Sequence, residues 1–257
     1  MSAFRFRENK HSWLGQVVHS IKSHKFVSLN LKGKDYGDAE LIWIAKALAK
    51  HRPTVTTASF QGVTDRGIHG FLDKDVVWAV PIERLYLRAC RISEEGVKIV
   101  ARALSHSKCP LQILTIGNCF VGPASAQVLA AALQQNKSLT RLSLESNVIG
   151  DAGANAILVA ALLHERLASL NLGKNRLTDA SVVNLPPIVR LQDLYLNDND
   201  LSDMGALDLA KAVMHSESLR WLELRSNRLT TRGIAALNLF LKNGLILQSE
   251  VQRNAAP

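Results

Sequence analysis

Apolar residues recur along the chain in one fixed order. The pattern L-x-x-L-x-L-x-x-N/C-x-L, written most faithfully in "LTRLSLESNVI", fits six segments closely and two more loosely. The close copies begin at Ile82, Leu111, Leu139, Leu167, Leu191 and Leu219, and the loose ones at Phe26 and Val55. Their starts are 29, 27, 29, 28, 28, 24 and 28 residues apart. Eight repeats of about 28 residues are therefore predicted over residues 26–244.

One repeat predicts a strand, a turn and a helix. Leu142 and Leu144 alternate with polar residues, which indicates a strand with one buried face. Asn147 follows where the chain must turn inward, and its amide can satisfy backbone groups left unpaired at the bend. Apolar residues then recur at helical spacing after Gly153. Such a unit cannot bury its apolar face alone, so the predicted fold class is an α/β solenoid, a curved horseshoe with a concave parallel sheet and convex helices.

The two ends differ from the repeats. Five apolar residues near the N-terminus fall on one helical face, namely Trp13, Leu14, Val17, Val18 and Ile21. They predict a helix over about 12–23, so residues 1–25 are interpreted as a cap helix with a basic arm. Beyond the last helix the pattern dissolves, and residues 245–257 are expected to form a short C-terminal cap and a loose tail.

Two repeats are irregular. The repeat from Leu167 has only 24 residues and carries Pro186 and Pro187, so a short turn or 3₁₀ segment is expected in place of its helix. The second repeat has Val63 near the usual Asn position. We expect distorted local curvature of the stack at both irregular repeats. The irregularity is explained either by decay of the repeat or by a role in recognition.

No pattern of catalytic chemistry stands out, and the sequence predicts no catalytic residue, no metal site and no cofactor. The histidines lack helical metal-site spacing, and neither a phosphate-binding loop nor a GxSxG turn occurs. Cys90 and Cys119 occupy the Asn position of their repeats, which indicates a structural role. Four aspartates recur just before helices, where N-capping or pairing with the helix dipole explains them: Asp65, Asp151, Asp179 and Asp203.

Positive charge is concentrated near the N-terminus. The net charge is +9, and residues 1–52 alone hold ten Lys or Arg against four Asp or Glu. The basic end, represented by Lys22, Lys25, Lys32 and Lys34, predicts either a solvated surface or a contact with an acidic partner, RNA or anionic lipid.

Three cysteines without a CxxC pair indicate a reducing, intracellular compartment. The cytoplasm is the first expectation, with the mitochondrion and the cilium or cytoskeleton as alternatives. No apolar run approaches the roughly 18 residues of a transmembrane helix.

Alternate strand residues are not needed for the core and are expected to face the concave side. Tyr, Trp and Arg are enriched among binding hot spots, so a partner-binding surface is predicted there. Basic residues dominate its N-terminal half and acidic residues its C-terminal half, which would orient a partner of opposite polarity. The alternative for Trp221 is packing against Tyr195. The predicted surface comprises Arg84, Tyr86, Arg88, Arg141, Glu145, Asp193, Tyr195, Asn197, Trp221, Glu223 and Arg225.

The repeat pattern, its long period and the "DxG" that opens helices at Asp151 and Asp203 resemble the leucine-rich repeat family, in its ribonuclease-inhibitor-like subclass. The resemblance covers nearly the whole chain and extends to the repeat regions of NOD-like receptors and of the Ran GTPase-activating protein. It implies a non-enzymatic scaffold for protein–protein interaction, or a subunit of a larger complex. The alternatives are a small-GTPase-activating protein of the Ran type, although the acidic C-terminal segment typical of that family is missing, and an assembly subunit that contacts RNA or an anionic surface.

Overall fold

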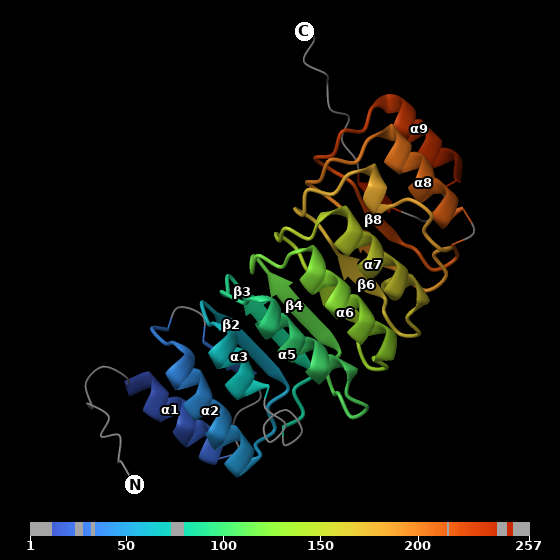
Figure 1. Cartoon of the computed structure of the whole chain (residues 1–257). Helices are drawn as coiled ribbons and strands as arrows, with labels where there is room; N and C mark the ends of the chain where they lie inside the picture. Colours follow the sequence, from blue (N-terminus) through green and yellow to red (C-terminus); the bar gives the residue numbers. More distant parts are fainter. Residues whose placement is uncertain are drawn as a thin grey trace.

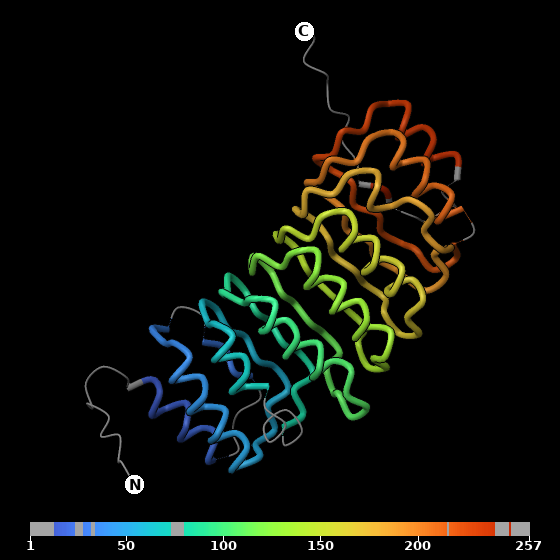
Figure 2. Tube along the Cα trace, viewed as in Figure 1, coloured from blue at the N-terminus to red at the C-terminus, as the bar shows by residue number. Residues whose placement is uncertain are grey.

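A computed structural model describes residues 12–23, 28–31, 34–72, 80–214, 216–240 and 246–248. Successive turns of the chain lie side by side (Figure 2), and helices cover one face of a continuous sheet (Figure 1). The stack curves from α1 at one end to α9 at the other. The predicted α/β solenoid is confirmed.

The described strands form one parallel sheet of nine strands, ordered as in the sequence. Each strand pairs in register with the next, so that equivalent residues of successive repeats lie side by side. β2, β3 and β4 have five residues and the other strands have three. The strands are β1 (Ser28–Asn30), β2 (Thr57–Gln61), β3 (Arg84–Arg88), β4 (Ile113–Gly117), β5 (Arg141–Ser143), β6 (Ser169–Asn171), β7 (Asp193–Tyr195), β8 (Trp221–Glu223) and β9 (Ile246–Gln248).

The convex side is built from helices. These are α1 (Ser12–Lys22), α2 (Asp38–His51), α3 (Asp65–Phe71), α5 (Glu94–Ser105), α6 (Pro123–Gln135), α7 (Gly150–Leu163), α8 (Asp203–Val213) and α9 (Thr231–Phe240). Between β6 and β7 the 3₁₀ turn η1 (Asp179–Ser181) takes the place of an α-helix on the convex side, as the adjacent prolines predict.

The N-terminal helix lies where the sequence predicts one. Leu14, Val18 and Ile21 of α1 are buried, and the Trp13 ring meets the Tyr36 ring edge-on with centroids 6.3 Å apart. α1 thereby covers apolar surface beside α2 at the end of the stack. The division into a 1–25 cap and arm, the 26–244 repeats and a 245–257 tail remains a prediction, and residues 1–11 and 249–257 lie outside the described residues.

The C-terminal end departs from the expectation of eight strands. β9 lies within the segment predicted to be a cap and tail, and it pairs in parallel with β8. An unpaired β8 would leave a row of open backbone N–H and C=O groups, and β9 bonds to them although the leucine pattern has ended.

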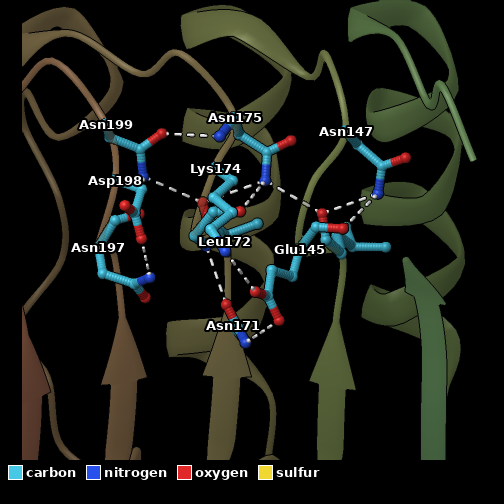
Figure 3. Close-up of polar contacts among 11 residues, drawn as sticks. Glu145, Asn147, Asn171, Leu172, Lys174, Asn175, Asn197, Asp198 and Asn199 are labelled. Carbon is cyan, nitrogen blue, oxygen red and sulfur yellow. Dashed lines mark hydrogen bonds and ion pairs between the residues drawn. The ribbon is translucent and has the colours of Figure 1, made fainter. Parts of the chain in front are cut away.

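An asparagine ladder joins the repeats where strands end. Asn147 Oδ1 accepts hydrogen bonds from the backbone N–H groups of Cys119 and Val121, both at 3.0 Å. Its Nδ2 donates to the carbonyls of Ile116 at 2.7 Å and Leu144 at 2.8 Å. One side chain thus satisfies backbone groups of its own repeat and of the preceding one. Asn175 and Asn199 donate in the same way in the next two repeats (Figure 3). Asn227 does so in the last repeat.

A second set of contacts, here called the aspartate clasps, joins helix starts. Asp179 accepts from the backbone N–H of Ser202 at 2.7 Å and from its hydroxyl at 2.5 Å. Equivalent pairs are Asp38–Thr64, Asp65–Ser93, Asp151–Thr178 and Asp203–Thr230. The predicted N-capping role of these aspartates is wrong, because Ser202 is the N-cap of α8, accepting from Met204 N–H at 3.2 Å. The aspartates instead hold the capping residue of the next repeat.

The clasps are interrupted at α6. Glu94 and Pro123 stand where neighbouring repeats have the aspartate, and Gly122 and Gly150 stand where they have the capping residue. At this point the helices approach closely, since a Cβ on Gly153 would lie 2.9 Å from the Ala126 Cβ.

The ladder predicts a large cost for losing one amide. Asn147→Ala should lower the free energy of unfolding by about 3–5 kcal/mol, because four buried backbone groups each lose a hydrogen bond to the amide. Urea denaturation followed by circular dichroism measures it. Gln134→Ala, on the exposed face of α6, is the control and should change stability by less than about 0.5 kcal/mol. A loss below about 1 kcal/mol for Asn147→Ala would contradict the role of the ladder.

The clasps predict non-additive effects. A Cβ on Gly205 would overlap the Asp179 carboxylate, so Gly205→Ala should destabilise the fold by about 1–3 kcal/mol. Asp179→Ala removes that overlap, and the double variant should be more stable than the sum of the single effects predicts. Combining Gly205→Ala with Asp65→Ala, in a distant clasp, should be additive within about 0.5 kcal/mol. Additivity of the first pair would show that the glycine is not there to admit the carboxylate.

Candidate binding surface

The concave surface consists of the strand residues that point away from the helices. Strand pairing aligns these residues into rows, one residue from each repeat. The first row holds Thr57, Arg84, Ile113, Arg141, Ser169, Asp193 and Trp221. The second holds Ser59, Tyr86, Thr115, Ser143, Asn171, Tyr195 and Glu223. A third, at the strand ends, holds Gln61, Arg88 and Gly117, continued in sequence by Glu145, Gly173, Asn197 and Arg225.

Three arginines of this surface are exposed and unpaired. Arg84, Arg88 and Arg141 make no ion pair or side-chain hydrogen bond with any described residue. Tyr86 lies between Arg84 and Arg88 on β3 and is partly exposed. β3 and β5 therefore present a basic surface with one aromatic ring.

The acidic residues of the surface are mostly engaged. Glu145 accepts from Asn171 Nδ2 at 3.3 Å and lies 3.8 Å from Lys174 Nζ (Figure 3). Glu223 is only 3% exposed and is bonded to the Arg225 guanidinium at 2.7 Å and 3.1 Å. The expectation that Glu223 is available to a partner is wrong, because its carboxylate turns back onto its own repeat.

Two further acidic positions differ from each other. Asp198 accepts from Asn197 Nδ2 at 2.6 Å. Asp193 is half-buried and has no partner among the described side chains. Asp193 thus remains available, whereas the predicted acidic half of the groove is largely satisfied internally.

The two aromatic residues of the C-terminal repeats are half-buried. Burial raises the pKa of Tyr195, and the nearby Asp193 carboxylate raises it further. Trp221 lies between Asp193 and the ninth strand, and its indole Nε1 is buried without a hydrogen-bond acceptor in the described part of the chain. β9 covers a side of β8 that the sequence pattern leaves open.

The cysteines take part in the ladder. Cys119 Sγ lies 3.2 Å from the Gly117 carbonyl and 3.4 Å from the Cys90 backbone N–H. The hydrogen bond with Cys90, and burial, raise the pKa of the Cys119 thiol, which keeps it protonated at neutral pH. Both positions serve backbone groups as the later asparagines do.

The described residues form neither a metal site nor a membrane-spanning helix. No group of three or more His, Cys, Asp or Glu side chains there could hold a metal ion. None of the helices in those ranges combines the length and the apolar character needed to cross a bilayer.

The basic end is only partly described. Lys22 ends α1 and Lys34 precedes α2, and both are exposed. Lys25 and Lys32, like Trp78, lie outside the described residues. The predicted contact of this end with RNA or lipid stays a prediction.

Two features of the fourth repeat were not predicted. A hollow of about 290 Å³ opens at Gly117, between Arg88 and Glu145. Phe120 is 74% exposed and holds a left-handed backbone conformation, with φ of 59°. Such a conformation is unfavourable for a bulky residue and is often found at functional positions. In the sequence, the glycine at the strand position 117 is the one sign of the hollow.

Known proteins with similar sequences were found for the repeats of this chain. A family model described as "Leucine Rich repeat" matches residues 135–158. The chain is 28% identical to human NACHT, LRR and PYD domains-containing protein 14 over 84% of its own length and 23% of the relative. It is 32% identical to mouse NACHT, LRR and PYD domains-containing protein 12 over 58% of itself and 15% of the relative. Pig ribonuclease inhibitor is 25% identical, over 86% of this chain and 56% of the relative.

The chain spans between about a seventh and somewhat over half of the length of these relatives. Two of these relatives have LRR in their names. In this chain the strand, the asparagine ladder and the helix recur with a period of about 28 residues. The chain is therefore similar, in sequence and in repeat unit, to leucine-rich repeat proteins of the ribonuclease-inhibitor-like subclass.

Proposed function

We propose that this chain is a non-enzymatic protein-binding module that holds a partner protein on its concave surface. The observation that carries the proposal is the set of exposed, unpaired Arg84, Arg88 and Arg141 around Tyr86. These side chains take part neither in the asparagine ladder nor in the aspartate clasps. Arginine and tyrosine are enriched among binding hot spots because they bury much area in few contacts. A relative named ribonuclease inhibitor lends support, since its name describes an action on another protein.

The charges define the partner further. Because Glu145 and Glu223 have basic partners within the chain, the three unpaired arginines of the described surface outweigh its one unpaired carboxylate, Asp193, and make the surface net positive. An acidic protein surface would be attracted and oriented by them. We infer that the contact centres on β3 to β5 and extends to Asp193 and Tyr195 at its edge.

Charge reversal tests the proposal. Tagged chain would capture its partner at low salt, mass spectrometry would identify that partner, and calorimetry with the purified protein would give the affinity. Tyr86→Ala and Arg141→Glu should each weaken binding at least about tenfold. Arg102→Glu, a matched charge reversal on convex α5, should change affinity by less than about twofold. Loss of binding with Arg102→Glu but not with Arg141→Glu would move the site to the helices.

Phe120 offers a test in which stability and binding change in opposite directions. Asn tolerates the left-handed conformation better than Phe, so Phe120→Asn should raise the midpoint of thermal unfolding by a few degrees. If the exposed ring lies at the edge of the contact, the same variant should weaken partner binding about fivefold or more. A variant that gains stability and keeps full affinity would exclude Phe120 from the contact.

A further inference from the structure

A polar hollow interrupts the concave surface at the end of β4. It has a volume of about 290 Å³, and its lining includes Arg88, Thr115, Gly117, Ser143 and Glu145. The hollow lies in the third row, where the neighbouring strands place the long side chains of Arg88 and Glu145 on either side of Gly117.

The backbone conformation at Gly117 does not require a glycine. Gly117 does not adopt a left-handed conformation, and a Cβ there would meet only the Glu145 carbonyl at 3.6 Å and Thr115 Cγ2 at 3.8 Å, which are ordinary contacts. At Gly173, in the same row, a Cβ would lie 2.7 Å from Asn197 Oδ1, so the Asn197 side chain would have to move. Gly117 is thus a vacant side-chain position.

The hollow also contains polar groups without partners. Thr115 is only 6% exposed, yet its hydroxyl makes no hydrogen bond with any described residue. The hydroxyls of Ser143 and Ser146, which also line the hollow, have no partner in the described ranges either. These hydroxyl oxygens remain accessible to solvent, so the cluster is available to hydrogen-bond an outside group.

The charge of the hollow comes from Arg88. Its guanidinium has no partner among the described side chains, whereas Glu145 is held from the other side by Asn171 and Lys174 (Figure 3). The lining therefore offers five guanidinium N–H groups and several hydroxyl donors to an anion. Its volume is at the lower end of ligand pockets, which suits one amino-acid side chain.

We propose that the hollow receives the carboxylate of a Glu or Asp side chain from the partner protein. Arg88 forms a bidentate ion pair with that carboxylate, and Thr115 and Ser143 donate hydrogen bonds to it. The nearby Glu145 disfavours a doubly charged phosphate. The proposal rests on the proposed function, because it assigns one anchor point within that concave surface.

A small probe tests the site without the partner. N-acetyl-glutamate amide would be titrated into ¹⁵N-labelled chain while the amide signals of Gly117 and Asn118 are followed by NMR. Saturable shifts with a dissociation constant of about 1 mM are expected for a ligand of this size. N-acetyl-glutamine amide, identical in shape but neutral, should bind at least about fivefold more weakly.

Three variants test the lining. Gly117→Gln fills the hollow with the side chain found at Gln61, and it should be at least as stable as the parent because glycine weakens strands. It should abolish the shifts, whereas Arg88→Gln and Thr115→Val should weaken binding at least about fivefold and twofold. The convex Arg102→Glu variant should bind the probe as the parent does.

The results separate this proposal from the proposed function. Equal shifts with the glutamine probe, tighter binding of N-acetyl-phosphoserine amide, or full binding by a folded Gly117→Gln variant would each overturn the carboxylate site. The site would also be overturned if Gly117→Gln kept full affinity for a partner whose binding Arg141→Glu abolishes, although the concave surface would then stand. If Arg141→Glu and Tyr86→Ala left partner binding intact, the proposed function would fail whatever the probe did.

Discussion

The structure depends on satisfying the backbone groups that each turn exposes to the core. Where a strand ends and the chain bends towards the helix, N–H and C=O groups point inward and cannot reach water. The Asn147 side chain serves two such N–H groups and two such carbonyls at once, three of them in the preceding turn and one in its own. Because an amide both donates and accepts, one residue per repeat fixes the spacing of adjacent turns. The strand register, and with it the rows of the concave surface, follows from this ladder.

The sequence is sufficient to predict features that each repeat requires on its own. Leu142, Leu144 and the residues at the same positions of the other repeats are buried, because they form the core face of each strand. Adjacent prolines exclude an α-helix near η1 in any surroundings. Features that need two repeats at once are not visible in the pattern. Asp179 has the spacing of a helix-start aspartate, but its carboxylate meets Ser202 one repeat later. β9 exists because β8 offers it an edge, not because its residues keep the repeat.

The same distinction applies to the surface. Alternation along a strand predicts that Arg141, Glu145 and Glu223 leave the core side, but it says nothing about which charges find partners. Glu145 is held by residues of the next repeat and Glu223 by the residue two positions on, so both carboxylates are engaged within the chain. The arginines on β3 and β5 have no such neighbours. A sequence pattern therefore identifies candidates for a binding surface, whereas its charge depends on side-chain geometry between repeats.

The fourth repeat lacks the aspartate clasps that join the helix starts of other repeats. Around α6 the clasps are absent and small residues bring the helices together, as the close approach of Gly153 to Ala126 shows. β3 and β4 pair over five residues beside the missing clasp between α5 and α6, whereas β4 and β5 pair over only three. In the turn between β4 and α6, Cys119 bonds to Cys90 and Asn147 of the neighbouring repeats, whereas the exposed Asn118 and Phe120 side chains make no hydrogen bond with a described residue. This is where the sheet has an empty position at Gly117 and where Phe120 stands exposed in a strained conformation. A repeat whose stability is secured by pairing and close packing can keep unfavourable residues at its surface, and such residues are retained most readily where they meet a partner.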